Sequence, residues 1–144
     1  MKSIVDLEIA APLSTVAALF SDPRNNAKWM DDIERVEPIS GLLGQVGSRY
    51  RLVPKRPGLL FVATVLSRDL PRELSLKLDA AAVSVMIHAK LTALAENRTR
   101  LISDEEFRFH GIFGRVTAWL ASNAVRKAHR HHIEAFKRFA EGAR

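Results

Sequence analysis

The sequence contains no cysteine and no long apolar run. The absence of cysteine excludes disulfide bonds and a thiol nucleophile, and it fits a reducing compartment. No segment approaches the roughly 18 consecutive apolar residues of a membrane-spanning helix, and the first six residues lack the apolar run of a signal peptide. We therefore expect a cytoplasmic protein.

Several signatures of catalysis and cofactor binding are also missing. The chain has no glycine-rich phosphate loop, no Ser-His-Asp order with a nucleophile elbow, and no paired acidic cluster at metal-ligand spacing. Three histidines lie close together, but on a helix only His129 and His132 share a side, while His131 diverges from them. Three tetrahedral ligands cannot be assembled from this set, so we expect no cofactor and no metal.

The residues that are present fit one α+β domain spanning residues 1–144, a length typical of a single hydrophobic core. A strand is predicted around residues 4–9. Pro12 then opens a helix, because its missing amide hydrogen costs nothing in a first turn. Asp22 is expected to cap a second, shorter helix that runs through Lys28.

Six further segments show the alternation or β-rich composition of strands, and turn signals bound each of them. They are residues 33–39, 48–53, 59–66, 73–78, 83–94 and 100–109. Their short links predict an antiparallel meander. The apolar phases that should point inward are Leu74, Leu76 and Leu78; Val85, Ile87, Ala89 and Leu91; and Leu101, Phe107 and Phe109. In 59–66 both phases are apolar, so the alternation leaves its orientation open.

Residues 111–144 are predicted to form one long helix. Its apolar positions recur near the helical period and predict a buried face: Phe113, Val116, Leu120, Ala124, Ala128, Ala135 and Phe139, with Trp119 beside them. The middle of this face is alanine, at 121, 124 and 128, where a filled core would place Leu or Phe. A sheet packed over it should therefore leave a cavity.

The net charge of the chain is +6, and most of it lies on this helix. Seven Arg or Lys and two Glu fall between residues 112 and 144, which leaves a net charge of +5 there. A basic surface can attract nucleic acid or an anionic membrane. No aromatic residues are interleaved with the basic ones on the polar side, so we expect no nucleic-acid partner. Weak contact with an anionic membrane and a merely solvated face are the two alternatives.

The order of one strand, two helices, six strands and a long helix resembles the helix-grip fold of the START-like, or SRPBCC, superfamily. Within it, the chain is similar to the bacterial polyketide cyclase/dehydrase and lipid-transport family. The likeness is carried by IAAPLSTVAALFSDPRNNAKW, the 44–47 turn before Ser48-Arg49-Tyr50, VLSRDLPREL, TRLISDEEFRF, and the 111–114 entry to the helix. It implies a curved seven-stranded antiparallel sheet that wraps around the helix and encloses an apolar ligand.

The resemblance and the strand alternation together give an expected ligand-binding lining. For 59–66, the likeness favours Phe61, Ala63 and Val65 inside. Trp29 and Tyr50 are amphipathic aromatics suited to a pocket or its mouth, although Trp29 is equally consistent with plain packing. The expected lining is Trp29, Tyr50, Phe61, Leu76, Ile87, Ser103, Phe107, Phe113, Val116, Leu120, Ala124 and Ala128.

Two residues are candidate catalytic groups. Glu105 shares the inward phase of its strand with Leu101 and Phe107, and a partly desolvated carboxyl group there can act as a general acid or base, or anchor a ligand hydroxyl. A bulge that turns it to solvent is the alternative. His132 lies on the predicted apolar stripe of the helix, where it is either catalytic or a hydrogen-bonded core residue.

Three functions follow from these expectations. The first is binding, with or without transport, of a small hydrophobic or aromatic ligand such as a lipid, an isoprenoid quinone or a polyketide. The second is a polyketide aromatase/cyclase-type enzyme that uses the same pocket for acid-base chemistry without a cofactor. The third is a co-chaperone or ribosome-associated interaction module, which an exposed apolar patch beside the helix would favour.

Overall fold

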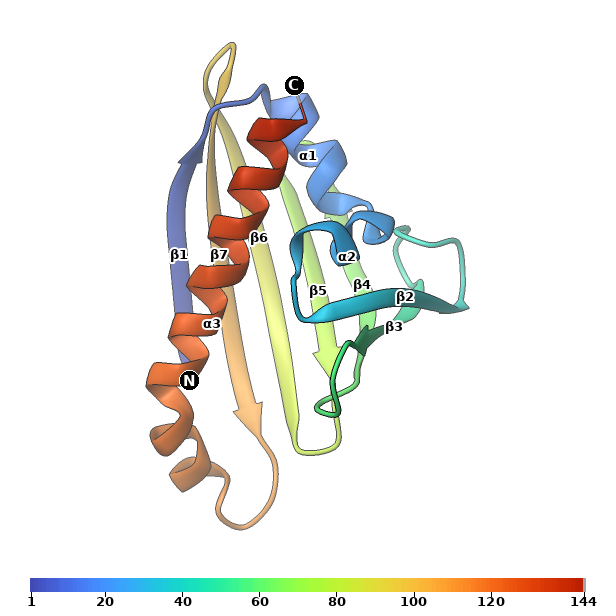
Figure 1. The fold of residues 1–144 in the computed structure, drawn as a ribbon, viewed down its shortest axis with the longest axis vertical. Coiled ribbons are helices and arrows are strands. Elements are labelled where there is room, and N and C mark those ends of the chain that lie inside the picture. Colours follow the sequence, from blue (N-terminus) through green and yellow to red (C-terminus); the bar gives the residue numbers. More distant parts are fainter. Residues whose placement is uncertain (144) are drawn as a thin grey trace.

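The computed structural model describes residues 1–143 as one antiparallel sheet with a long helix laid across it (Figure 1). Arg144, one of the seven basic residues counted on the helix, lies outside the described residues. The elements are β1 (Lys2–Ile9), α1 (Leu13–Ser21), the 3-10 helix η1 (Pro23–Asn25), α2 (Asn26–Trp29), β2 (Ile33–Ser40), β3 (Arg49–Pro54), β4 (Phe61–Asp69), β5 (Glu73–Asp79), β6 (Val83–Ala95), β7 (Arg98–Phe109) and α3 (Gly114–Gly142).

The seven strands follow the order β1-β7-β6-β5-β4-β3-β2, and every neighbouring pair is antiparallel. This confirms the predicted α+β helix-grip architecture, a meander closed by the first strand at one edge. None of the helices in the described part of the chain is long and apolar enough to span a membrane.

The strand register places the predicted apolar phases on one face of the sheet. Val65 pairs with Leu76, Leu76 with Ile87, and Ile87 with Glu105, so these four residues form one row across β4 to β7. Directly paired residues share a face. The partner of Tyr50 in β4 is Ala63, and Ala63 and Val65 are buried, so the favoured inward phase of β4 is confirmed.

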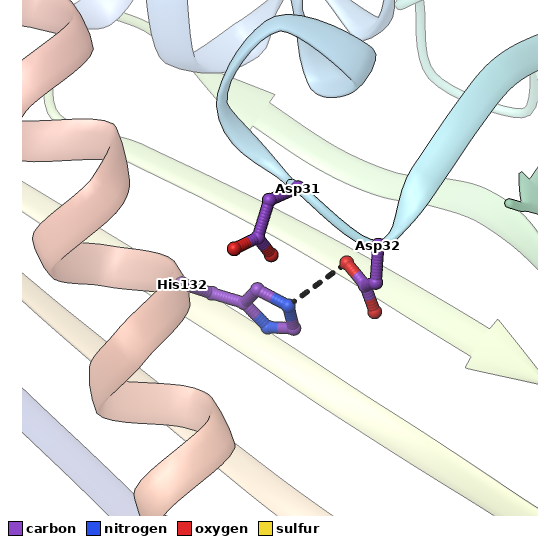
Figure 2. A group of neighbouring side chains, drawn as sticks. All are labelled: Asp31, Asp32 and His132. Carbon is purple, nitrogen blue, oxygen red and sulfur yellow. Dashed lines mark hydrogen bonds and ion pairs between the residues drawn. The ribbon is translucent and has the colours of Figure 1, made fainter.

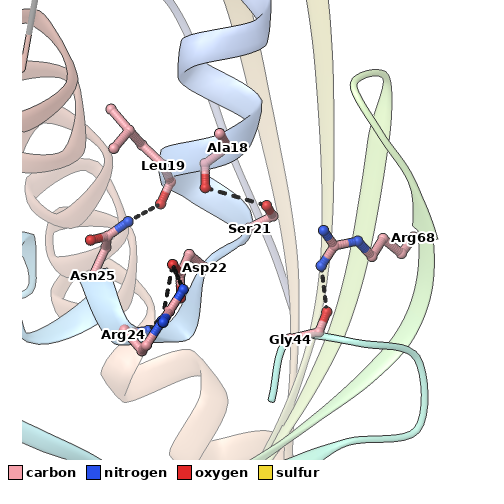
Figure 3. Close-up of polar contacts among 8 residues, drawn as sticks. All are labelled: Ala18, Leu19, Ser21, Asp22, Arg24, Asn25, Gly44 and Arg68. Atoms are coloured by element: carbon pink, nitrogen blue, oxygen red, sulfur yellow. Dashed lines mark hydrogen bonds and ion pairs between the residues drawn. The ribbon is translucent and has the colours of Figure 1, made fainter. Parts of the chain in front are cut away.

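The link between α1 and α2 is held by short-range polar contacts (Figure 3). Asp22 accepts a hydrogen bond from the Arg24 amide at 3.0 Å and forms an ion pair with its guanidinium at 2.8 Å. Asp22 thus caps η1, the turn that leads into α2, whereas the N-cap residue of α2 itself is Asn25. Asn25 donates to the Leu19 carbonyl at 3.2 Å. These contacts fix the direction in which α2 approaches the sheet.

Buried apolar residues form two clusters. One lies where the second half of α3 covers β1, β6 and β7, and includes Val5, Leu101, Ile133 and Phe136. The other lies under α2 and β3 to β5, and includes Tyr50. In the first cluster, Phe136 makes edge-on contacts with the rings of Phe20 and Trp29 at 4.9 and 5.3 Å between centroids.

The predicted buried face of the long helix is wrong in its first half. Phe113, Val116 and Leu120 are 72%, 53% and 71% exposed, and Ala124 is exposed as well. The buried residues of α3 are instead Gly114, His129, Ile133, Phe136 and Ala140. Apart from Gly114 at the helix start, these lie on a stripe that is shifted by one residue from the predicted one, and they belong to the half of α3 that packs against β1, β7 and α1.

Candidate functional site

A cavity of about 820 Å³ lies between α3 and the inner face of the sheet. Its wall on the sheet side is formed by apolar side chains of β3 to β7: Leu52, Phe61, Leu74, Leu76, Leu78, Val85, Ile87 and Phe107. Val125, Ala128 and Ile133 of α3 close the opposite side, and Trp29 and Met30 close one end. A cavity of this size and character suits a small, mostly apolar molecule.

Most residues expected in the lining are found there. The cavity is lined by Trp29, Tyr50, Phe61, Leu76, Ile87, Ser103, Glu105, Phe107, Ala128 and His132. The remaining four, Phe113, Val116, Leu120 and Ala124, lie on the exposed first half of α3 and do not line it. On α3 the cavity faces Val125 to Ile133, so Ala128 lines it while Ala121 and Ala124, the other two alanines at the middle of the predicted face, do not.

Glu105 is the acidic group of the inner wall. Its side chain is 16% exposed and shares a row with Leu76 and Ile87, as the alternation of β7 predicted. Burial raises the pKa of Glu105 to about 7; the negative charge of Asp104 acts in the same direction, and His132 opposes it. Near neutral pH this carboxyl group is therefore divided between a hydrogen-bond donor and a carboxylate.

His129 is the partner of Glu105, and sequence reasoning missed it. Its side chain is fully buried, and its Nε2 lies 3.3 Å from Glu105 Oε2. The two ring nitrogens contact Ser3 Oγ at 2.8 Å and Ser103 Oγ at 2.9 Å. Burial lowers the pKa of His129 to about 4, so the ring is neutral and donates through one nitrogen while accepting through the other.

The signal for His129 was its spacing from the later core residues. His129 precedes Ile133 by four residues and Phe136 by seven, the intervals of one helical face. The predicted apolar face runs through Ala128 and Ala135, so it indicates His132, which lies on that face, instead of His129.

Tyr50 supplies a second polar group at the wall. Its side chain is 2% exposed and is hydrogen-bonded with Asn26 of α2. Burial raises the pKa of Tyr50 to about 12, so its hydroxyl stays protonated. Among residues 1–143 the buried indole nitrogen of Trp29 has no hydrogen-bond partner, which leaves a donor beside the cavity.

Two histidine–aspartate hydrogen bonds join α3 to the turn before β2, beside the cavity. His131 Nε2 lies 2.8 Å from Asp31 Oδ2, and His132 Nε2 lies 3.1 Å from Asp32 Oδ1. Figure 2 shows Asp31, Asp32 and His132 converging. Hydrogen bonds from the histidines lower the pKa of both aspartates. Burial alone lowers the pKa of His132, but the bond to Asp32 and the charges of Asp32, Glu105 and Asp31 together raise it.

The same three residues also bring metal-binding atoms together. One ligand atom each from Asp31, Asp32 and His132 lies within 4.8 Å of the others. No local pattern in the sequence indicates this grouping, because His132 is 100 residues away from Asp32 along the chain. Both aspartates are exposed and are already satisfied by histidine donors, so their position is explained without an ion.

Comparisons with known proteins agree with this architecture. The sequence matches the family described as polyketide cyclase/dehydrase and lipid transport over residues 3–141. No match is found among curated proteins.

Solved structures with the same fold are distant in sequence. TTHA0849 from Thermus thermophilus superposes with a TM-score of 0.81 at 14% identity, with 99% of each chain covered. A START superfamily protein from Mycobacterium smegmatis gives 0.79 at 17% identity, again with 99% of each chain covered. The Zhui aromatase/cyclase from Streptomyces sp. R1128 gives 0.71 at 17% identity, covering 96% of this chain and 95% of that one.

At these identities the structural likeness establishes the fold alone, while the sequence match covers nearly the whole chain. The protein therefore belongs to the polyketide cyclase/dehydrase and lipid-transport family.

Proposed function

We propose that the protein binds a small, largely apolar molecule that carries a carbonyl or hydroxyl oxygen, such as a lipid, an isoprenoid quinone or a polyketide. The observation that carries the proposal is the cavity of about 820 Å³, whose apolar wall contains Glu105 as its buried acidic group. Apolar surface supplies the affinity, and a few convergent polar groups orient the ligand. The family to which the chain belongs includes lipid-transport proteins.

Glu105 is suited to hold the oxygen atom of such a ligand. A protonated carboxyl group donates a hydrogen bond to a carbonyl, and its carboxylate form accepts one from a hydroxyl. Either bond forms in a site from which water is largely excluded, where an unmade hydrogen bond is costly. Tyr50 and Trp29 add donors on another side of the cavity.

Filling the cavity tests the binding proposal. Leu76→Trp should reduce the affinity for the fluorescent apolar probe N-phenyl-1-naphthylamine by roughly tenfold or more, because the indole occupies the space in front of Ile87. Leu66→Trp is the matched control, since Leu66 lies in β4 but is 41% exposed and does not line the cavity. Equal affinity in the wild type and Leu76→Trp overturns the proposal.

A second function, acid-base catalysis of the cyclase type, is favoured by the contact between Glu105 and His129. The neutral imidazole and a carboxyl group that titrates near pH 7 lie 3.3 Å apart at the wall. In its protonated form Glu105 can donate its proton to a ketone oxygen, while the neutral His129 imidazole accepts a proton from the adjacent carbon. The products are the enol that carbon-carbon bond formation requires, the Glu105 carboxylate and a protonated His129.

Deuterium exchange at the α-carbon of a bound ketone, 2-tetralone, measures this chemistry by NMR without knowledge of the natural substrate. Glu105→Gln should slow the catalysed exchange by roughly 10²- to 10⁴-fold. Glu106→Gln should leave it unchanged, because the exposed Glu106 points to the other face of the same strand. A wild-type protein that binds 2-tetralone without accelerating its exchange is a binder and no enzyme of this type.

A further inference from the structure

The start of α3 carries an apolar surface that faces solvent. We call it the helix-tip patch, and its members, with their exposed fractions, are Ile112 (96%), Phe113 (72%), Val116 (53%), Trp119 (75%) and Leu120 (71%). Scattered exposed apolar residues are ordinary, but a contiguous group of large ones indicates a binding surface. None of these five residues lines the cavity.

Helix geometry directs Leu120 away from the sheet. Leu120 precedes the buried His129 by nine residues, which is two and a half turns, so the two side chains lie on opposite sides of α3. Lys127 follows Leu120 by seven residues and therefore lies on the same side as Leu120. Arg126, Lys127 and Arg130 are all exposed. Lys127 continues the outward face that Leu120 begins, while Arg130 and Arg126 lie about 80° and about 120° around the helix from Leu120 and flank that face.

A second exposed apolar segment borders the cavity mouth. Leu59 and Leu60, in the loop between β3 and β4, are 52% and 44% exposed, and they follow the basic residues Lys55 and Arg56. Lys55, Arg56 and Leu59 also line the cavity.

The strand register shows that this loop and the helix tip lie at the same end of the sheet. Val62 pairs with Asp79, Asp79 with Ser84, and Ser84 with Arg108. The start of β4 and the end of β7 therefore lie at the same end of the sheet. Since the β3–β4 loop leads into β4 and the loop into α3 leaves β7, both loops lie at this end, toward the lower end of the molecule in Figure 1.

We propose that this end of the protein docks on an anionic lipid bilayer, with the helix-tip patch and Leu59–Leu60 inserted at the level of the headgroups. Trp119 suits the interface between headgroups and acyl chains, and the adjacent Arg and Lys side chains complement anionic lipids. Docking places the rim of the cavity at the membrane surface. The exchange of an apolar ligand with the bilayer rests on the proposed binding function, whereas the docking itself does not.

The charges distinguish a membrane from a second copy of this chain. If two helix-tip patches packed against one another, the exposed basic residues of the same stretch of α3, including Arg115 and Lys127, would approach those of the other copy. Like charges at such a contact oppose association. Anionic lipid supplies the opposite charge.

Vesicle sedimentation tests the apolar part of the surface. The wild type should bind phosphatidylcholine vesicles that contain phosphatidylglycerol, more weakly as salt is added, and pure phosphatidylcholine vesicles far less. Phe113→Ser combined with Leu120→Ser should weaken binding by roughly tenfold or more. Leu42→Ser is the control: Leu42 is 79% exposed but lies in the loop between β2 and β3, remote from the helix tip.

A charge reversal tests the basic part. Lys127→Glu should weaken binding to the anionic vesicles by roughly five- to thirtyfold, since one favourable charge is replaced by an unfavourable one. Lys90→Glu makes the same change on β6 at the opposite end of the sheet, next to Glu73, and should have little effect.

Three outcomes overturn the docking proposal: no binding to anionic vesicles at low salt, equal losses in the helix-tip and Leu42 variants, or a dimer in solution that Phe113→Ser with Leu120→Ser abolishes. Binding of N-phenyl-1-naphthylamine should be unchanged in every helix-tip variant. A protein that binds vesicles but not this probe contradicts the proposed ligand-binding function alone, and the converse contradicts docking alone.

Discussion

The Nε2 atom of His129 lies 3.3 Å from Glu105 Oε2, where a helix and a strand meet at the wall of the cavity. Burial moves the two pKa values in opposite senses, raising that of Glu105 to about 7 and lowering that of His129 to about 4. Both groups are therefore largely neutral just below pH 7, and the pair is a carboxylic acid beside a neutral base. This relationship underlies the proposed ligand chemistry and the expected pH dependence of stability.

Replacing Glu105 with glutamine should stabilise the protein at alkaline pH. In the unfolded chain Glu105 ionises near 4.5, but in the fold it stays protonated up to about pH 7. The free energy of unfolding therefore falls as the pH rises between these values. Glu105→Gln should gain about 1 to 3 kcal/mol more at pH 8 than at pH 4. Urea unfolding at both pH values measures the difference, and a gain equal to that of Glu106→Gln contradicts it.

His129→Ala should destabilise the fold by about 2 to 4 kcal/mol, since it removes a buried ring and leaves two serine hydroxyls without their partner. The hydroxyls are those of Ser3 and Ser103, both buried. The control is His131→Ala, whose side chain is 53% exposed and whose loss should cost less than about 1 kcal/mol. Thermal unfolding of both variants gives the comparison, and equal costs would show that the hydrogen-bonded cluster contributes no stability.

The ion pair between His132 and Asp32 should be visible in an NMR titration. Asp32→Asn should lower the pKa of His132, because the hydrogen bond and charge of Asp32 help to raise it. The raised pKa contributes stability that is complete below the unfolded value near 6.5 and is lost as the pH rises through the folded value. Asp69→Asn, at the end of β4 where Asp69 pairs with Arg72, should leave the titration of His132 unchanged. A His132 pKa that is insensitive to Asp32→Asn would mean that the pair does not form in solution.

Replacing Leu120 and Leu101 with alanine compares two leucines that the sequence predicted to be buried, of which the structure buries only Leu101. Leu120→Ala should change the free energy of unfolding by less than about 0.5 kcal/mol, because an exposed side chain loses little. Leu101→Ala should cost about 2 to 5 kcal/mol, because Leu101 is fully buried. Chemical denaturation of both proteins decides the point. A large decrease in the free energy of unfolding of Leu120→Ala would mean that Leu120 is buried, as the sequence predicted.

The sheet was predictable because alternation and turn residues are local signals. Leu76, Ile87 and Glu105 face inward as their strands' period requires, and the register then places them in one row. Asp22 caps the helical turn after α1 as its position before a proline indicates. These inferences needed no knowledge of distant contacts.

The buried face of α3 was harder to predict, since two sets of apolar positions, one residue apart, both repeat at helical spacing. Only packing selects the stripe of His129 and Ile133 over that of Ala128 and Ala135. Periodicity also cannot reveal that no layer covers the first turns of α3, so Leu120 was predicted to be buried. The pairing of Asp32 with His132 joins segments 100 residues apart and left no local trace.

The most direct test of ligand binding in the cavity is a methyl NMR titration with 2-tetralone, an apolar molecule with one carbonyl oxygen. We predict that the methyl resonances of Leu76 and Ile87 shift with a common saturable affinity, while those of the exposed Leu66 and Leu120 stay in place. Glu105→Gln should alter the affinity, because the group facing the carbonyl changes. Shifts at Leu120 with none at Leu76 and Ile87 would contradict the account.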